Sequence, residues 1–160
     1  MTREDAYYMQ IKLLCGHVEL YDPWLNTYLE EEDPLSDIVL KLLDCQDNLN
    51  DILRCLNLYC LEKTFDAKNV YRRLRLELCK HYENATMTKD SIMSELFRIS
   101  QQIPDCPFQN QCLILSYYYF LLTELEAMDM SVNMGEFDAE LYKWLTIGGT
   151  IDTHDMLERK

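Results

Sequence analysis

Apolar side chains recur three and four residues apart along most of this chain, which is the spacing that places them on one face of an α-helix. The clearest stripe follows Pro34 and consists of Leu35, Ile38, Val39, Leu42 and Leu43. Only 4 Gly and 4 Pro occur in 160 residues, too few for the turns that an all-β fold needs every ten residues or so. The sequence therefore predicts an all-α fold: a single-domain antiparallel bundle, or stacked helical hairpins, of six to eight helices over residues 1–160.

Local start and stop signals place the first helices. Thr2, with Asp5 three residues later, is typical of a capping box that opens a helix. The Tyr-Asp-Pro run at residues 21–23 is predicted to end that helix, and residues 24–29 form a short amphipathic piece. Asp33-Pro34 predicts a new helix, with the acid as N-cap and the proline as its first helical residue.

An internal echo leaves two interpretations of residues 34–62. Residues 33–39 are repeated in character fourteen residues later by residues 47–53. One long helix would carry two heptads, since fourteen is twice seven, whereas two short helices would start on equivalent caps. The lack of Gly or Pro between residues 44 and 48 favours one helix. The polar run at residues 44–47 favours a tight corner capped by Asp47, and we favour two helices.

Later signals divide the second half of the chain. Thr64 or Asp66 is predicted to cap one helix, and Thr88 the next. The Pro-Asp-Cys-Pro run at residues 104–107 is predicted to be a linker, because two prolines bracket two residues.

Apolar residues also predict two helices near the C-terminus. Residues 108–128 are apolar on nearly every face, which predicts a central helix. A final helix is predicted to bury Phe137, Leu141, Trp144 and Leu145. We expect a flexible tail from about residue 148, where two glycines adjoin.

Charge is the strongest feature of the composition. The chain has 28 Asp and Glu against 15 Lys and Arg, a formal charge of −13 and a sequence pI near 4.5. A field of this sign repels nucleic-acid phosphates and attracts basic proteins. Direct nucleic-acid binding is therefore not expected.

The acidic residues gather in two clusters. The first begins with the unbroken run Glu30, Glu31, Glu32 and Asp33, expected between two helices, and continues through Asp37, Asp44, Asp47 and Asp51. The second consists of Glu124, Glu126, Asp129, Glu136, Asp138 and Glu140. Each is either a solvated face or a docking surface for a basic protein.

We expect the first cluster to bind the partner. Trp24 and Tyr28 would supply the hydrophobic anchor beside it, since aromatic residues are common hot spots of interfaces. The predicted partner-binding residues are Trp24, Tyr28, Glu30, Glu31, Glu32, Asp33, Asp37, Asp47 and Asp51. If reversing charges there left binding unchanged, the interface would move to the second cluster.

The seven cysteines predict neither a disulfide framework nor a metal site. Their number is odd, and no basic start followed by an apolar stretch marks an export signal. Free thiols, a cytoplasmic location and no cofactor are therefore expected. The Cys-x-His pairs at residues 15–17 and 79–81 point in different directions on a helix and cannot grip one ion. Cys106, between the linker prolines, is predicted to be the most exposed thiol, made inert by the neighbouring Asp105.

No membrane span is expected either. The longest apolar run, residues 112–122, has eleven residues and includes Ser116. About twenty apolar residues are needed to cross a bilayer.

Evidence for catalysis is thin. Arg75 and His81, six apart in one predicted helix, loosely resemble the Arg…His signature of the helical RNases called HEPN domains, in which this pair acts on the phosphodiester. Leu76 stands where that signature has a polar residue, and the negative charge opposes RNA binding. No paired-carboxylate or Ser/His/Asp arrangement is present, so we predict that the chain is not an enzyme.

In size, acidity and lack of catalytic motifs, the chain resembles the small acidic all-α immunity proteins of bacterial toxin–immunity systems. The capped helix start at residues 33–39 is of the kind seen there. The resemblance implies a bacterial, cytoplasmic inhibitor that neutralises a basic toxin or nuclease by direct binding.

Two other binding functions stay open. One is a DNA-mimic inhibitor of the anti-restriction or anti-CRISPR type, in which carboxylates stand in for phosphates. Its acids should follow a ribbon, whereas here they cluster at helix starts and corners. The other is a generic helical adaptor.

Overall fold

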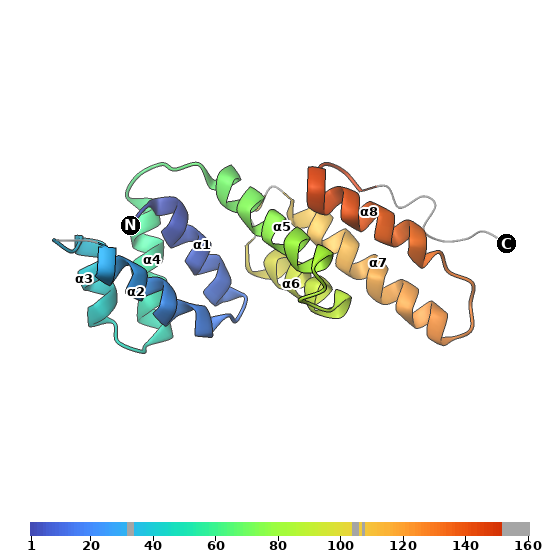
Figure 1. Ribbon diagram of the computed structural model, residues 1–160, viewed down its shortest axis with the longest axis horizontal. Coiled ribbons are helices and arrows are strands. Elements are labelled where there is room, and N and C mark those ends of the chain that lie inside the picture. Colours follow the sequence, from blue (N-terminus) through green and yellow to red (C-terminus); the bar gives the residue numbers. More distant parts are fainter. Residues whose placement is uncertain (32–33, 104–105, 107, 152–160) are drawn as a thin grey trace. The chain divides into compact units, whose positions relative to one another are not determined.

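The computed structural model describes residues 1–31, 34–103, 106 and 108–151, and within them every regular element is helical (Figure 1). The all-α prediction is confirmed. In chain order the elements are α1 (Arg3–Leu14), the 3₁₀ turn η1 (Val18–Leu20), α2 (Tyr21–Glu31), α3 (Asp37–Asp44), α4 (Leu49–Leu61), α5 (Ala67–Glu83), α6 (Lys89–Gln102), α7 (Gln109–Ala127) and α8 (Met134–Ile147). None of the described helices is long and apolar enough to cross a membrane.

Backbone proximity groups the chain into two compact units, Met1–Tyr71 and Arg72–Lys160. The boundary lies inside the continuous helix α5, and the assignment of residues 1–160 to a single domain stays a prediction. Each unit is described by itself below.

The first unit is built on α1 packed against α4, with α3 against α4 and α2 against α3. Its buried core consists of Ala6, Met9, Leu13, Tyr21, Leu25, Ile38, Val39, Leu42, Ile52, Leu56 and Cys60. The predicted stripe after Pro34 is largely confirmed, because three of its members are buried and Leu35 packs against them. Leu43 is the exception, with 40% of its surface exposed.

The first helix starts as predicted but ends earlier. The Thr2 hydroxyl oxygen accepts a hydrogen bond from the Asp5 N–H at 3.1 Å, which confirms the cap. The helix stops at Leu14, where Gly16 takes a φ of +96° that favours glycine. Pro23 was expected to stop the helix but lies in the first turn of α2. Proline is tolerated there because the first N–H groups of a helix have no partner within it.

Residues 34–62 form two helices, as we favoured. The corner between α3 and α4 contains Gln46 at φ +50°. Asn48, not Asp47, caps α4: its side-chain oxygen accepts from the backbone N–H groups of Asn50 at 3.1 Å and Asp51 at 3.4 Å. An Asn side chain at the residue directly before the helix satisfies N–H groups that Asp47 is one position too early to reach.

Helix α3 begins later than predicted. Its N-cap is Ser36, in an extended conformation, so Pro34 lies before the helix instead of being its first residue. Packing of Leu35 against the core accounts for the extended entry. Asp33, the predicted cap, lies outside the described residues.

In the second unit, α6 and α7 form an antiparallel hairpin and α8 packs on α7 (Figure 1). Two hydrogen bonds fix the direction of the hairpin: the Tyr119 hydroxyl donates to Asp90, and the Gln109 side chain donates to the Ser100 carbonyl at 2.7 Å. The predicted cap Thr88 is confirmed by a bond from the Ser91 N–H at 3.2 Å. At the start of α5, Asp66 accepts from the Lys68 N–H at 3.0 Å, which selects Asp66 over Thr64.

The end of the chain agrees with the prediction as far as it is described. All four apolar residues predicted for the last helix, Phe137, Leu141, Trp144 and Leu145, are buried. Gly148 ends α8 at φ +81°. Most of the predicted linker (residues 104, 105 and 107) and most of the predicted tail (residues 152–160) lie outside the described residues.

Helix α7 is less enclosed than predicted. Its Leu113, Tyr117 and Phe120 are exposed, at positions i, i+4 and i+7 of one helix face. Helices α6 and α8 cover its other sides. Helix α7 is therefore apolar on nearly all faces in sequence but is not buried on all of them.

Candidate partner-binding groove

Helices α3 and α4 of the first unit border two adjoining cavities of about 280 Å³ and 350 Å³. Both are lined by Lys41, Cys55 and Leu58. The first adds Ser36, Asp37, Ile38, Tyr59 and Glu62, and the second adds Asp44, Cys45, Asp51 and Arg54. We call the two cavities together the α3–α4 groove.

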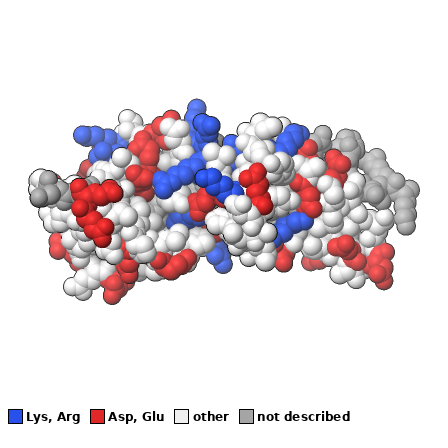
Figure 2. Space-filling model, in the orientation of Figure 1, with Lys and Arg blue, Asp and Glu red and all other residues white. Residues whose placement is uncertain are grey.

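Acidic side chains outnumber basic ones in this groove. Four carboxylates (Asp37, Asp44, Asp51 and Glu62) line it beside two basic residues, Lys41 and Arg54, and all six are exposed. Within the part of the chain that the structure describes, no ion pair joins the three aspartates to a basic group, and Glu62 pairs with Arg3 at 3.4 Å. The groove therefore presents uncompensated negative charge to solvent. Figure 2 shows Asp and Glu side chains at several separate places on the visible face of this unit, among side chains that are mostly uncharged.

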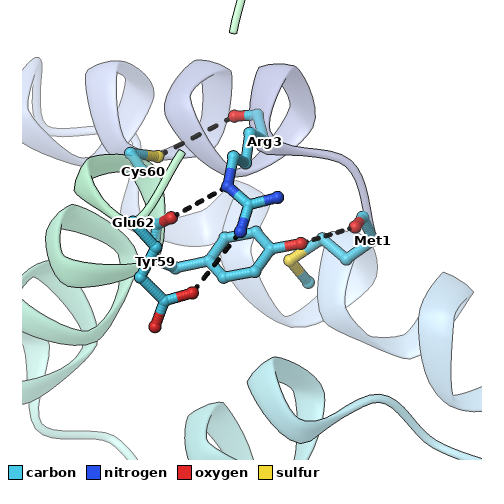
Figure 3. A network of polar contacts seen from close by, with 5 residues as sticks. All are labelled: Met1, Arg3, Tyr59, Cys60 and Glu62. Carbon is cyan, nitrogen blue, oxygen red and sulfur yellow. Dashed lines mark hydrogen bonds and ion pairs between the residues drawn. The ribbon is translucent and has the colours of Figure 1, made fainter. Parts of the chain in front are cut away.

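One end of the groove is held by a polar network around Arg3 (Figure 3). The Arg3 guanidinium lies over the Tyr59 ring at 4.5 Å and donates to the Tyr59 carbonyl at 3.2 Å. The Tyr59 hydroxyl donates to the Met1 carbonyl at 2.9 Å, and the Cys60 thiol to the Arg3 carbonyl at 3.8 Å. These contacts join the start of α1 to the end of α4, so they fix where Tyr59 and Glu62 stand in the groove.

The predicted partner-binding residues divide into two groups. Asp37 and Asp51 line the groove, and Asp47 is exposed in the corner between its two helices. Glu30 and Glu31 are exposed on α2, and Glu32 and Asp33 lie outside the described residues.

The acidic run was expected to lie between two helices. Its first two residues, Glu30 and Glu31, instead belong to the last turn of α2. The backbone carbonyls at this end of a helix carry partial negative charge. Two carboxylates at that position are therefore unfavourable for the helix, by about 0.3–1 kcal/mol each at low ionic strength.

The two predicted aromatic anchors are used partly inside the unit. The Trp24 and Tyr28 rings contact each other edge to face at a centroid distance of 5.4 Å. Both are half-buried and pack against the core of the first unit. Only part of each ring is accessible to a partner.

Sequence reasoning missed the apolar part of the groove. Leu58 lines both cavities and is 54% exposed, and Leu40 on α3 is 46% exposed. A signal for Leu58 was available: Ile52, Leu56 and Cys60 are the buried stripe of α4, and Leu58 falls off it. An apolar residue outside the buried stripe of a helix is a candidate contact residue.

The second acidic cluster is partly neutralised. Asp138 forms an ion pair with Lys89, and Glu140 forms one with Lys143 at 2.9 Å. Glu124 and Glu126 remain exposed on the last turn of α7. Among the described residues, two of the six carboxylates in this cluster thus form ion pairs with lysines, against one of the four carboxylates that line the groove.

Arg75 and His81, the pair that loosely matches a nuclease signature, have structural contacts. The Arg75 guanidinium donates to the carbonyls of Trp144 at 2.9 Å and Leu145 at 2.7 Å, near the C-terminal end of α8. Burial lowers the pKa of this guanidinium from its usual value. The His81 ring lies 2.8 Å from the Thr86 hydroxyl and 3.9 Å from the Glu77 carboxylate.

The predicted exposure of Cys106 is wrong. Its side chain is buried, with 5% of its surface accessible, and burial raises the pKa of its thiol to about 11. Asp105, which was expected to raise this pKa, lies outside the described residues, and the low reactivity of the thiol stays a prediction. The seven cysteines, all of them described, are free thiols. Among the residues that the structure covers, no group of three or more His, Cys, Asp or Glu side chains is placed to hold a metal ion.

No protein family, curated protein or solved structure matches the chain. What the groove can bind therefore follows from its own residues.

Proposed function

We propose that this chain is a non-enzymatic inhibitor that binds a basic protein through the α3–α4 groove, as an immunity protein binds its toxin. The observation that supports this most is the presence of exposed carboxylates without basic partners beside the exposed Leu58 in one groove. A partner that offers lysines or arginines around an apolar side chain fits that surface.

Electrostatics supports a basic partner. Residues 1–71 carry 14 acidic and 6 basic side chains, and the described groove acids Asp37, Asp44 and Asp51 are exposed. Exposed charges of one sign steer an oppositely charged protein into contact and raise its association rate. Screening beyond about 10 Å at 0.1 M salt makes that rate fall as salt rises.

Apolar contact would supply the affinity that exposed charges alone do not. Interfaces typically combine an apolar centre with a polar rim. In the groove, Leu58 lines both cavities together with Lys41 and Cys55, and each carboxylate lines one of the two cavities. A partner that inserts an apolar side chain against Leu58 would place its basic residues near Asp37 and Asp51.

The end of α2 gives a second, independent support. Glu30 and Glu31 stand at the helix end where negative charge is unfavourable. A bound basic protein would relieve this repulsion. Residues that lower the stability of the free fold are often retained for function.

The proposal is tested by comparing two charge-matched variants as affinity baits in extracts of the source cells. Asp37→Lys/Asp51→Lys changes the groove, and Glu124→Lys/Glu126→Lys makes the same net change on the second cluster. We expect the wild-type chain and the second variant to capture the same basic protein, and the groove variant to lose it. Association of the purified pair should then slow as salt rises.

Equal capture by both variants would place the interface outside the groove. If neither variant captures the protein, the partner recognises net charge alone, which also contradicts the proposal. Circular dichroism of both baits checks that each is folded, because Asp37 and Asp51 lie in the first turns of α3 and α4 and their reversal to lysine is expected to lower stability.

A further inference from the structure

Two of the seven cysteines differ from the rest. Cys15, Cys60, Cys79, Cys106 and Cys112 are buried, whereas Cys45 and Cys55 are only half-buried. All seven lie in the part of the chain that the structure describes. The two accessible thiols line the same 350 Å³ cavity of the α3–α4 groove.

The two thiols are also neighbours. Cys45 is the C-cap of α3, and Cys55 lies on the second turn of α4, which packs against α3. Cys45 is close enough to Cys55 to raise the pKa of the Cys55 thiol. The Cys45 thiol also lies 3.2 Å from the Lys41 carbonyl. A disulfide requires two Cα atoms within about 7 Å of each other, and two cysteines that line one cavity between packed helices are candidates for such a bond.

A buried phenol interacts electrostatically with the pair. The Tyr21 side chain is buried, and its hydroxyl has no hydrogen-bond partner among the described residues. Burial is the main cause that raises the pKa of Tyr21, and its electrostatic interactions with Cys45 and Cys55 add to the effect.

We propose that Cys45 and Cys55 form a dithiol modification site that a low-molecular-weight disulfide, such as oxidised glutathione, converts into an intramolecular disulfide. Cys45 attacks one sulfur of the small disulfide as a thiolate, which forms a mixed disulfide and releases one small thiol. Cys55 gives its proton to solvent and attacks the Cys45 sulfur, which releases the second small thiol. Two protein thiols are oxidised, and one small disulfide is reduced to two thiols.

The environment assigns the order of the two attacks. Burial, followed by the neighbouring Cys45, raises the pKa of the Cys55 thiol, while Lys41 lowers it in part. Because the thiolate is the nucleophile, the raised pKa slows attack by Cys55 on the small disulfide. The proposal therefore has Cys55 as the resolving thiol, which attacks the mixed disulfide at Cys45. The site lies in the proposed binding groove but does not depend on the identity of any partner.

Proximity favours the internal bond over links between molecules. Groups held together within one chain meet at effective concentrations on the order of mM. At micromolar protein the internal disulfide should therefore form about a thousandfold faster than a link between two chains. The five buried thiols should stay reduced in the native protein.

The test oxidises the full-length native chain with oxidised glutathione, blocks remaining thiols with iodoacetamide, and maps unreduced tryptic peptides by mass spectrometry. Cleavage after Lys41, Arg54 and Lys63 places Cys45 in residues 42–54 and Cys55 in residues 55–63. We expect these two peptides to be joined, with the loss of two hydrogen atoms. The native thiol count should fall by two, and dithiothreitol should restore it.

Cys60 shares the second peptide with Cys55, so two variants separate them. Cys60→Ser should keep the cross-link, whereas Cys55→Ser should end as a glutathione adduct at Cys45. A cross-link that survives in Cys55→Ser, or a first cross-link between any other cysteines, would overturn the proposal. So would separate glutathione adducts on Cys45 and Cys55 in the wild type. The wild-type peptide map decides the question even if a variant fails to fold.

Discussion

Reversing one charge at each end of the acidic cluster should change stability in opposite directions. Glu31 is the last residue of α2 and Asp37 is the first residue of α3. Both are exposed. Glu31→Lys and Asp37→Lys alter the net charge by the same amount, so the two variants differ only in which helix end receives the positive charge.

The size of the effect follows from the helix macrodipole. An acidic side chain costs about 0.3–1 kcal/mol at the C-terminal end of a helix and contributes a similar amount at the N-terminal end. Glu31→Lys replaces an unfavourable interaction by a favourable one, so the free energy of unfolding should rise by about 1 kcal/mol. Asp37→Lys should lower it by about the same amount. Ser36 makes no side-chain hydrogen bond at this cap, so Asp37 is the main side chain acting on the start of α3.

Thermal unfolding followed by far-UV circular dichroism measures the difference. For a chain of this length, 1 kcal/mol corresponds to about 2–4 °C in Tm, so the two variants should lie on opposite sides of the wild type. The gap should shrink between about 0.01 M and 1 M salt, where the Debye length falls from about 30 Å to 3 Å. If both variants shift Tm in the same direction by equal amounts, stability depends on net charge and not on the helix end that is changed. In that case a partner would not gain by offsetting the repulsion between Glu30, Glu31 and the end of α2.

Three further outcomes are expected. Arg75→Met should lower the free energy of unfolding by about 1–3 kcal/mol in urea titrations, because the Trp144 and Leu145 carbonyls lose their donor. Alkylation of Cys106 in the native protein should keep accelerating up to about pH 11, where its pKa lies, which peptide mapping after timed iodoacetamide exposure can follow. Burial, with the hydrogen bond to Asp90, raises the pKa of Tyr119 from 10.0 to about 12, so its contribution to stability should be complete below pH 10 and lost between pH 10 and 12. Tyr119→Phe should remove that part of the alkaline loss of stability.

Helix starts could be predicted where one side chain decides them. Thr2 and Thr88 each accept a bond from an N–H three residues later, and this requires only the local sequence. The corner between α3 and α4 was harder to place. Asp47 and Asn48 are both good caps, and the choice between adjacent positions depends on how Ile52 and Leu56 reach the core.

The two misplaced boundaries both involve proline. A proline is compatible with the first turn of a helix and also with the segment that precedes or follows one. At Pro23 the preceding Tyr21 is buried at the start of α2, so packing sets the helix start two residues before the proline. At Pro34 the following Leu35 packs in an extended segment, so the helix starts after it. Tertiary contacts determine where α2 and α3 begin, and these contacts cannot be predicted from the local sequence.

The candidate site was only partly visible in the sequence. Its carboxylates could be predicted from the charge pattern, because a run of acidic residues is expected to be exposed however the helices pack. The roles of Lys41, Cys55 and Leu58 depend on how α3 and α4 face each other. In the same way, the pairing of Cys45 with Cys55 joins residues from two helices, and no spacing rule for a single helix predicts it.

The shortness of α3 explains why this helix exposes leucines as well as acids. The helix has eight residues, and Ile38, Val39 and Leu42 fill its core-facing side. Leu40 and Leu43 point elsewhere and stay exposed, so they add little to the stability of the free protein. An isolated helix of this length is not stable in water, which means that α3 depends on packing for its structure. A partner that covers its outer leucines would therefore gain apolar contact and also stabilise the helix that presents Asp37 and Asp44.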